Sequence, residues 1–438
     1  MMTEFFLSPV YYKTRKLIRD TRFYTAEAHL DWQKKALADL LAYAFKEIPY
    51  YRNECGDLAK EVSPETALEL LAAVPMMSKI MIRRELDSLY KPNRLRALKS
   101  ATIGATSTPM PFYIDRLHTR QKELAFLWDQ WSRAGFMPGD TVASFTGHTS
   151  PPGKLYSINR LNHMVVFSSF DVVLENIREI VNILNHIKPL FFHGYPSVIA
   201  TLANLMKKRG EQLDFAPEAV FCGSEKMFPL QRQLIEEAFH TQVYTWYGHS
   251  EYAVLGGECE HSSHFHLFPQ YGYVEFHDTG ILHESGKTLY EIVATGFNNR
   301  IMPFIRYRTG DYAVIADDNA CACGRVYPMI EEVVGQAQEF LVDQDGNVVS
   351  LAALRAHFEK LPYIDDLYFF QERPGQFDFF ILPSRKPYSE EISALEDVVR
   401  QMTRGRLRPK VHLTHEVPVT PVGKRKLVDQ KLDVASYI

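Results

Sequence analysis

Residues 245–251 read Thr-Trp-Tyr-Gly-His-Ser-Glu and follow a short β-rich run at 242–244. A strand that ends in an aromatic residue, a glycine, a hydroxyl and a carboxylate offers a flat ring for a base, room for close approach, and oxygen atoms for Mg²⁺ and phosphate. The same pattern also fits an ordinary strand end with a turn and a surface glutamate. The stretch therefore indicates nucleotide chemistry only if other parts of the chain supply matching groups.

A second stretch that supplies such groups lies at residues 306–311 and reads Arg-Tyr-Arg-Thr-Gly-Asp. It follows an apolar run at 301–305 that Pro303 interrupts. A carboxylate placed after a glycine, as Asp311 is, accepts two hydrogen bonds from a vicinal diol such as a ribose. The two stretches together predict one nucleotide-binding site.

In this order and at this separation, the two stretches resemble the YG(T/S)E and (Y/F)RTGD signatures of adenylate-forming enzymes. The closer resemblance is to the phenylacetate-CoA ligase-like branch and its capsule-biosynthesis relatives. It runs from 49–52 to 423–424 and includes 193–197 and 223–225. It implies that Tyr247 stacks on adenine, that Ser250 lies near phosphate, and that Glu251 is a catalytic residue that helps to hold Mg²⁺. The full set assigned to the nucleotide is Gly223, Ser224, Glu225, Tyr247, Gly248, Ser250, Arg308 and Asp311, with Arg308 near ribose or phosphate.

A loop of small residues at 101–109 matches the place of the family's phosphate loop. Such loops bind phosphate because backbone N–H groups point inward and hydroxyls add donors. Thr102, Gly104 and Thr106 agree with the family pattern and are the expected phosphate contacts. Ser107 replaces a glycine, which removes easy access to positive φ and predicts a stiffer or differently shaped loop. An ordinary surface loop is the alternative.

The composition excludes several classes of protein. The chain has 438 residues, 46% of them hydrophobic, so it can bury a large core. A net charge of -4 gives no reason to expect nucleic acid as a partner. The N-terminus does not resemble a signal peptide, and no apolar run approaches the about 18 residues that span a bilayer. Five cysteines, an odd number, argue against a disulfide scaffold, so we expect a cytoplasmic protein.

The chain between residues 174 and 223 alternates helical and strand-like segments, which is typical of a parallel α/β sheet. With the resemblance, this predicts an α/β fold in which a large N-terminal adenylate-forming domain, residues 1–334, has mixed and parallel sheets with helices. Residues 335–438 would form a small, mobile α+β domain. At their junction, Gln336 and Gln338 stand where the family has charged residues, which predicts weaker contact with phosphate.

A metal site is indicated by Cys259, the histidines that follow it, and a Cys-Ala-Cys-Gly turn at 321–324. Cys321 and Cys323 can present two thiolates to one ion, and Cys259 with a histidine completes the tetrahedron that zinc prefers. His261 and His266 are both candidates for the fourth ligand. A closed set of four ligands predicts a structural Zn²⁺. Unrelated free thiols and a histidine-rich loop are the alternative.

Lys424 lies in a Pro-Val-Gly-Lys-Arg-Lys segment at 421–426 and takes the place of the family's catalytic lysine. A lysine on a flexible loop can neutralise charge that develops between a carboxylate and an α-phosphate. A solvated basic tail is the alternative interpretation.

The resemblance implies an ATP-dependent, AMP-forming ligase that converts a small carboxylic acid into an acyl-adenylate with Mg²⁺, and then into a thioester with coenzyme A. Aromatic residues at 145, 246 and 252 favour an aryl or otherwise flat acid, although such residues are more often plain core. One alternative is transfer of the acyl group to an amine or hydroxyl in capsule or natural-product synthesis. Another is a non-catalytic nucleotide-binding homologue. A homodimer is compatible with the sequence, which does not identify the acid.

Overall fold

The computed structural model describes residues 7–93, 95–102, 110–146, 151, 154–160, 162–283, 285–318, 320–334, 340–351, 354, 358, 363–383, 385, 387–416, 428–432 and 437. Its centre is a sheet of twelve strands in the order β11-β12-β13-β14-β10-β9-β8-β7-β6-β3-β5-β4. The helices and strands of the N-terminal part are α1 (Pro9–Thr21), α2 (Ala26–Glu47), α3 (Pro49–Cys55), η1 (Gly56–Lys60), α4 (Ala67–Ala73), α5 (Lys79–Arg84), β1 (Ala97–Ala101), β2 (Pro111–Asp115), α6 (Thr119–Trp131) and η2 (Ser132–Ala134).

One half of the large sheet is parallel. It contains β3 (Val142–Thr146), β5 (Met164–Ser168), β6 (Phe191–Gly194), β7 (Ala219–Cys222) and β8 (Val243–Gly248), with β4 (Tyr156–Asn159) antiparallel at the edge. The connections carry η3 (Ser169–Asp171), α7 (Ile177–Ile187), α8 (Pro196–Arg209) and α9 (Pro229–Phe239). The helix–strand alternation expected for 174–223 is confirmed, because parallel neighbours need crossovers of this kind. Apolar side chains of α7, α8 and these strands form one core.

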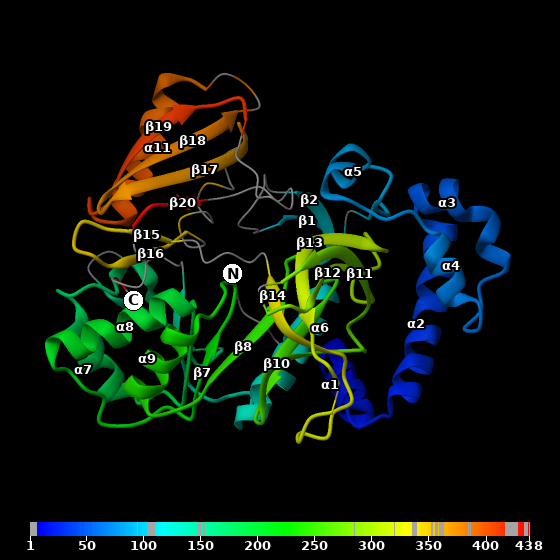
Figure 1. The fold of residues 1–438 in the computed structure, drawn as a ribbon, viewed down its shortest axis with the longest axis horizontal. Helices are drawn as coiled ribbons and strands as arrows, with labels where there is room; N and C mark the ends of the chain where they lie inside the picture. Colours follow the sequence, from blue (N-terminus) through cyan, green and yellow to red (C-terminus); the bar gives the residue numbers. More distant parts are fainter. Residues whose placement is uncertain are drawn as a thin grey trace.

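The other half of the sheet is antiparallel and consists of β9 (Leu255–Cys259), β10 (Ser262–Leu267), β11 (Gly272–Leu282), β12 (Thr288–Gly296), β13 (Tyr307–Ile315) and β14 (Met329–Val334). The strand β8 joins the halves, since it pairs in parallel with β7 and antiparallel with β9. The N-terminal helices α2 to α5 pack beside the antiparallel half, on the side of the molecule away from α7 to α9 (Figure 1).

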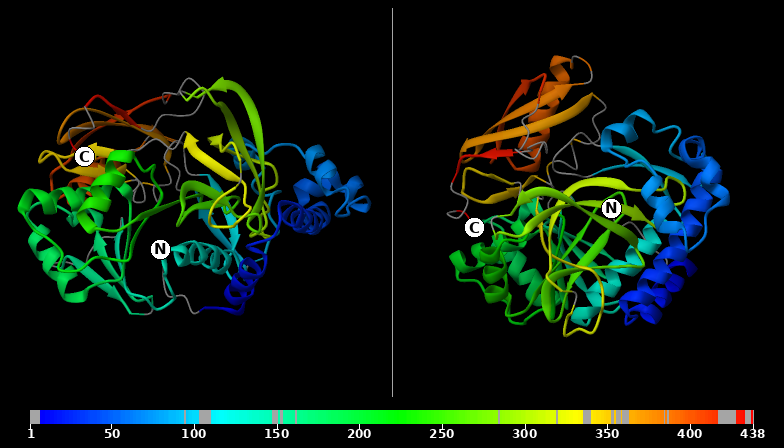
Figure 2. Two further views of the ribbon diagram at one scale, coloured as in Figure 1. Left: turned by 60° about the horizontal axis from the view of Figure 1, so that its bottom comes forward. Right: turned by 45° about the vertical axis from the view of Figure 1, so that its right-hand side comes forward.

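The C-terminal part contains two small sheets. The pair β15 (Phe340–Val342) and β16 (Val348–Ser350) is joined by a turn in which Gly346 has φ +79°, as the Asp-Gly-Asn sequence at 345–347 predicts. A second sheet has the order β19-β18-β17-β20, from β17 (Ile364–Arg373), β18 (Gln376–Pro383), β19 (Arg408–Leu413) and β20 (Val428–Gln430), with α11 (Ser389–Met402) packed on it. Figures 1 and 2 show these elements grouped to one side of the large sheet, which agrees with an α/β fold and a smaller α+β part.

Among the described helices, none combines the length and the hydropathy that crossing a bilayer requires.

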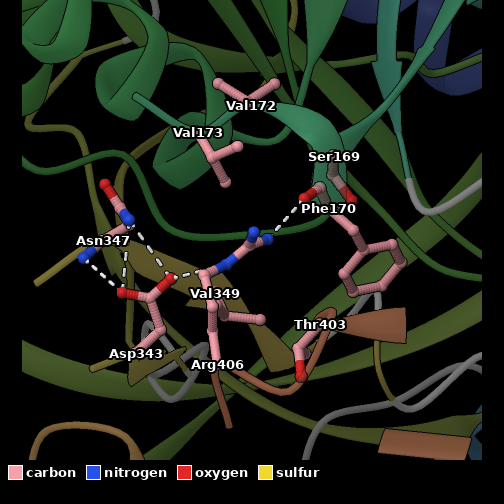
Figure 3. Close-up of a pocket in the computed structure, with 9 residues that line it drawn as sticks. All are labelled: Ser169, Phe170, Val172, Val173, Asp343, Asn347, Val349, Thr403 and Arg406. Carbon is pink, nitrogen blue, oxygen red and sulfur yellow. Dashed lines mark hydrogen bonds and ion pairs between the residues drawn. The ribbon is translucent and has the colours of Figure 1, made fainter. Parts of the chain in front are cut away.

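The C-terminal part touches the rest of the chain at η3, through two arginines. Arg406 is buried, donates a hydrogen bond of 2.8 Å to the carbonyl oxygen of Phe170, and places its Nε 3.2 Å from a carboxylate oxygen of Asp343. Arg404 forms an ion pair with Asp171. Figure 3 shows the Arg406 guanidinium extended between Asp343 and Phe170. This charge-assisted contact joins the first C-terminal turn, η3 and the segment before β19.

Replacing Arg406 by methionine should loosen this junction. The change removes the bond to Phe170 and leaves the buried Asp343 carboxylate without its guanidinium, and breaking a buried ion pair costs about 3 kcal/mol. We expect faster amide hydrogen exchange in β15 and β16, and unchanged exchange in β8 and β9. Replacing the exposed Arg408 by methionine is the matched control. Equal protection of β15 and β16 in both variants would show that Arg406 does not hold the junction.

Candidate active site and metal centre

The first signature stretch ends β8 and forms a tight turn. Tyr252 donates its backbone N–H to the carbonyl oxygen of His249 over 3.1 Å and has φ +59°, a left-handed conformation that is costly for an aromatic residue. Because β7 and β8 are parallel neighbours, the turn and the loop after β7 lie at the same edge of the sheet. His249, Ser250 and Glu251 thus lie at the same edge of the sheet as Gly223.

The two signature stretches are joined by reciprocal hydrogen bonds. The hydroxyl of Tyr247, in the first stretch, donates to Asp311 in the second over 3.2 Å. The hydroxyl of Tyr307, in the second stretch, donates to Glu251 in the first over 2.5 Å. Burial first, and the neighbouring carboxylates second, raise the pKa of both phenols well above its usual value, so both stay protonated and donate. The structure therefore brings the predicted ribose-binding and Mg²⁺-binding carboxylates into one cluster.

The ring of Tyr247 is fully buried, and its hydroxyl also lies 3.1 Å from Nε2 of His249. The described conformation gives this ring no open face, so its stacking on adenine stays a prediction. Gly248 is partly exposed beside it, and Ser250 is partly exposed in the turn.

The loop after β7 is shaped by Trp246. A Cβ atom on Gly223 would lie 2.3 Å from the Trp246 indole, so only glycine allows this ring to cover the backbone. The indole is also stacked on His193, with ring centroids 5.7 Å apart. The ring that covers Gly223 on this face is a side chain of the protein, so a contact between Gly223 and the nucleotide stays a prediction.

The next two residues of this loop have different surroundings. Ser224 is exposed at the edge of the sheet and has φ +69°. Glu225 is buried and accepts a hydrogen bond of 3.1 Å from the backbone N–H of Ser197, in the first turn of α8. A carboxylate at a helix N-terminus is stabilised by the free N–H groups there. Glu225 therefore fixes the loop to α8.

Two other predicted contacts are engaged with protein groups. Arg308 lies on β13 and makes two bonds of 2.8 Å to the carboxylate of Glu291 on β12. Thr102 is buried, and its hydroxyl accepts the N–H of Met110 over 2.9 Å, while its own N–H donates to the Met110 carbonyl over 3.0 Å. Thr102 thus closes the base of the β1–β2 loop. Gly104, Thr106, Ser107, Gln336, Gln338 and Lys424 lie outside the described residues.

A cluster of sulfur and nitrogen atoms lies at the far end of β9 and β10. One ligand atom from each of Cys259, His266, Cys321 and Cys323 lies within 4.8 Å of the other three. Cys259 Sγ is 3.6 Å from Cys321 Sγ, and Cys323 Sγ is 3.5 Å from His266 Nε2. A tetrahedral zinc with bonds of about 2.0–2.3 Å needs ligand atoms about 3.3–3.8 Å apart, so these separations fit one ion.

The geometry favours His266 over His261 as the fourth ligand. Nδ1 of His266 lies 3.1 Å from the carbonyl oxygen of His264, so Nδ1 carries the proton and Nε2, which faces Cys323, has the free lone pair. Burial lowers the pKa of His266 to about 4, which keeps the ring neutral, as a ligand must be. The side chain of His261 is outside the four-residue cluster, although its backbone N–H donates to Cys259 Sγ over 3.3 Å.

Positive charge surrounds this cluster. Three thiolates and one neutral histidine around a divalent ion carry a net charge of about −1 by the ligand charges. Arg325 is buried beside Cys323 and pairs with Glu260 over 3.4 Å. Burial alone would raise the pKa of Cys323, but hydrogen bonds and charge from Arg325 lower it. Gly324 has φ +74° and donates its N–H to the Cys321 carbonyl, which turns both thiols the same way.

No family model matches the chain. The chain is 24% identical over 285 residues to protein CapK of Staphylococcus aureus, a match that covers 63% of this chain and 61% of CapK. It is also 24% identical over 427 residues to the phenylacetate-coenzyme A ligase of Thermus thermophilus, which covers 90% of this chain and 92% of that ligase. The chain therefore matches less than two thirds of CapK and nearly all of the ligase.

Solved structures agree with this result. The fold matches 2-hydroxyisobutyryl-CoA ligase in complex with an acyl-adenylate and CoA, with a TM-score of 0.59 and 19% identity over 94% of this chain and 92% of that one. The same ligase in the postadenylation state gives a TM-score of 0.56 over 96% and 92% of the chains. The chain therefore shares the fold of this acyl-CoA ligase.

The structure also brings to the site residues that the sequence did not single out. Tyr307 and His249 both lie inside the quoted stretches, but their roles depend on which strands face each other. The bond from Tyr307 to Glu251 crosses from β13 to the turn after β8, and nothing in the local pattern marks it. The one sequence feature that could have indicated Tyr307 is its position as an aromatic residue at the start of a buried strand, close to a polar turn.

Replacing Gly223 by alanine should disturb the loop after β7. The new methyl group overlaps the Trp246 indole, and such overpacking costs about 1–3 kcal/mol. We expect a lower free energy of unfolding by that amount, together with a change in tryptophan fluorescence. Replacing Gly56 by alanine is the control, because its Cβ would meet its nearest neighbour at 3.7 Å. Equal stability of the two variants would show that Trp246 does not require a glycine at 223.

Proposed function

We propose that the protein activates a carboxylic acid with ATP and then forms a thioester with coenzyme A. In the first step a carboxylate oxygen of the acid attacks the α-phosphorus of ATP, and the bond from this phosphorus to the oxygen shared with the β-phosphate breaks. The products are an acyl-adenylate and pyrophosphate. In the second step the CoA sulfur attacks the acyl carbon and AMP leaves. The observation that carries the proposal is the reciprocal bonding that places Asp311 and Glu251 in one cluster.

The two carboxylates of this cluster have separate parts in the reaction. Asp311 accepts hydrogen bonds from the ribose hydroxyls of ATP. Tyr307 occupies one oxygen of Glu251, which leaves the other to hold Mg²⁺ with the phosphate oxygens of ATP. The donor set fits Mg²⁺, which prefers one or two carboxylates together with substrate phosphates. When bound, Mg²⁺ neutralises charge on the phosphates.

The other predicted contacts surround the same edge of the sheet. Ser224 and Gly223 border the base, and Ser250 and Gly248 lie next to the phosphates. Thr102 anchors the loop in which Gly104 and Thr106 donate to phosphate. Arg308 reaches ribose or phosphate by leaving Glu291, and Lys424 neutralises the developing charge between carboxylate and α-phosphate. Holding the reactants in line and stabilising this charge are the chain's main contributions to the rate.

The acid is proposed to be aryl or similar in shape. The relative that covers nearly all of this chain is named a phenylacetate-coenzyme A ligase, and the matched structure is named a 2-hydroxyisobutyryl-CoA ligase. These names set the first acids to test. We propose in addition that the residues 1–334 hold the nucleotide, that the part from 335 onward moves between the two steps, and that the protein works in the cytoplasm.

ATP–pyrophosphate exchange in the presence of Mg²⁺, with no acceptor, tests the first step. We expect exchange with at least one acid from a panel of aryl, hydroxy, fatty and amino acids, and thioester formation when CoA is added. Replacing Lys424 by alanine should lower exchange about 100-fold or more while ATP still binds, because a single charge-stabilising contact contributes this much. Replacing the exposed Lys410 by alanine is the matched control.

Two results would change the assignment. Exchange without any thioester, together with acyl transfer to an amine or hydroxyl, would identify a different acceptor. ATP binding without exchange for any acid would indicate a nucleotide-binding homologue that does not catalyse the reaction.

We propose that Cys259, His266, Cys321 and Cys323 hold one structural Zn²⁺. The set is closed, since four protein ligands leave no position for water or substrate. We expect about one zinc per chain by elemental analysis of protein purified without chelators. Replacing Cys259 by serine or His266 by alanine should remove the zinc and lower the unfolding temperature, whereas replacing His261 by alanine should leave one zinc bound. Zinc well below one per chain in the unmodified protein, with Cys321 and Cys323 both alkylated, would contradict the proposal.

A further inference from the structure

A cavity of about 300 Å³ lies inside the antiparallel half of the large sheet. The strand β11 is at one edge of this sheet, and β12 and β13 separate it from β14 and β10. The first residues of β11 nevertheless line the same cavity as the ends of β10 and β13, the start of β14 and one residue of α2. The sheet therefore curves until β11 approaches β10 and β14, and the space left between them has the size of a small-molecule pocket.

The cavity has a buried end and a mouth. The side chains at the buried end are almost completely removed from solvent and belong to Val254, Leu267, Phe268 and Met329. The mouth is formed by half-buried side chains, Val274, Phe276 and Ile315, together with the exposed Pro328. Because the exposure of the walls increases toward the mouth, a ligand can enter there and bury itself against apolar walls.

The walls select against charge. Of the described residues that line the cavity, none carries a charge at neutral pH. An ionised carboxylate or phosphate that enters such walls loses its hydration and gains no cation. None of the described lining residues is assigned above to the nucleotide or to the metal. The cavity is therefore separate from the proposed active site and is unsuited to ATP, to CoA and to an ionised acid.

One amide group gives these walls a polar point. Gln33, on α2, donates from Nε2 to the carbonyl oxygen of Pro269 over 3.1 Å and to that of Gly272 over 2.9 Å. Pro269 and Gly272 also line the cavity, so the amide lies at its wall. Both N–H groups of the amide are used, whereas no donor to Oε1 is found among the described residues. Oε1 is also absent from the buried side-chain atoms that lack a partner, so it keeps accessible surface. A ligand that meets this amide must offer a hydrogen-bond donor.

The volume sets the size of the ligand. An apolar cavity of about 150 Å³ holds one benzene ring. The cavity inside the curved sheet has about twice this volume, which accommodates two fused rings. We propose that it binds an uncharged, mainly apolar molecule of about ten non-hydrogen atoms whose single N–H or O–H donates to Oε1 of Gln33. Indole is the simplest bicyclic compound with these properties.

Calorimetric titration of the unmodified protein with three compounds tests this assignment. Indene has the two-ring shape of indole without the N–H, and indole-3-acetate adds a carboxylate. We expect indole to bind at one site per chain and indene to bind about 5- to 10-fold more weakly, because Oε1 then has no donor. Indole-3-acetate should not compete with indole, even if it binds elsewhere as an acid substrate.

Filling the mouth with a protein side chain should exclude the ligand. Val274→Phe and, independently, Ile315→Phe should each weaken indole binding about 10-fold or more, because the new ring occupies the same volume. Val398→Phe is the matched control, since Val398 is a half-buried valine on α11 that does not line the cavity. Thermal unfolding shows whether each variant keeps its fold, and the comparison of indole with indene needs no variant.

Several results would overturn the inference. They are equal affinity for indole and indene, unchanged affinity in both filled variants, and competition by indole-3-acetate. A dimer in sedimentation that Val274→Phe dissociates, without indole binding to the unmodified protein, would assign the cavity to a second copy of the chain instead. None of these measurements depends on acyl-adenylate formation, so the inference and the proposed function are tested separately.

Discussion

The site depends on two reciprocal hydrogen bonds, each from a tyrosine hydroxyl in one signature stretch to a carboxylate in the other. Tyr247 bonds to Asp311 and Tyr307 bonds to Glu251, so each stretch supplies a donor to the other. These bonds cross from the end of β8, where the sheet changes from parallel to antiparallel, to β13. Next to them, the backbone of Met77 bonds to both Arg306 and Arg308, which attaches the N-terminal helical part to the same strand. The end of β8, the strand β13 and the N-terminal helical part therefore meet near Asp311 and Glu251.

Much of the fold could be predicted from the sequence because the signals are local. The hydroxyl of Ser78, a residue type that commonly caps helices, accepts the N–H of Met81 at the start of α5. The Asp-Gly-Asn turn depends on local turn chemistry, and the strand–helix alternation up to Gly223 depends on the period of apolar residues. Both signals lie within a short stretch of sequence. The order of strands in the sheet comes from packing between distant segments.

The sequence indicates which residues belong to the site, but it does not indicate which partners they contact. Arg308 was assigned to the nucleotide, yet its partner Glu291 lies on the neighbouring strand and only pairing reveals it. The choice of His266 over His261 depends on the carbonyl of His264, which orients one ring nitrogen toward the sulfur atoms. A glycine at 223 can be expected at a strand end, but the side chain that fills its empty side comes from the next strand. The contacts of Arg308, of Gly223 and between His266 and Cys323 each join separate segments of the chain, so no local pattern indicates them.

The carboxylates of the active-site region share a kind of partner that suits their proposed work. Glu251 and Asp311 each accept a hydrogen bond from the hydroxyl of a buried tyrosine. A neutral donor orients a carboxylate without cancelling its charge, whereas an arginine or lysine at the same distance would neutralise it. The contrast lies within the same chain, since Arg406 and Arg325 neutralise acids at the junction and beside the thiols. Carboxylates that only hold the fold together are paired with cations there, whereas Glu251 and Asp311, which are proposed to meet Mg²⁺ and ribose, are bonded to neutral donors.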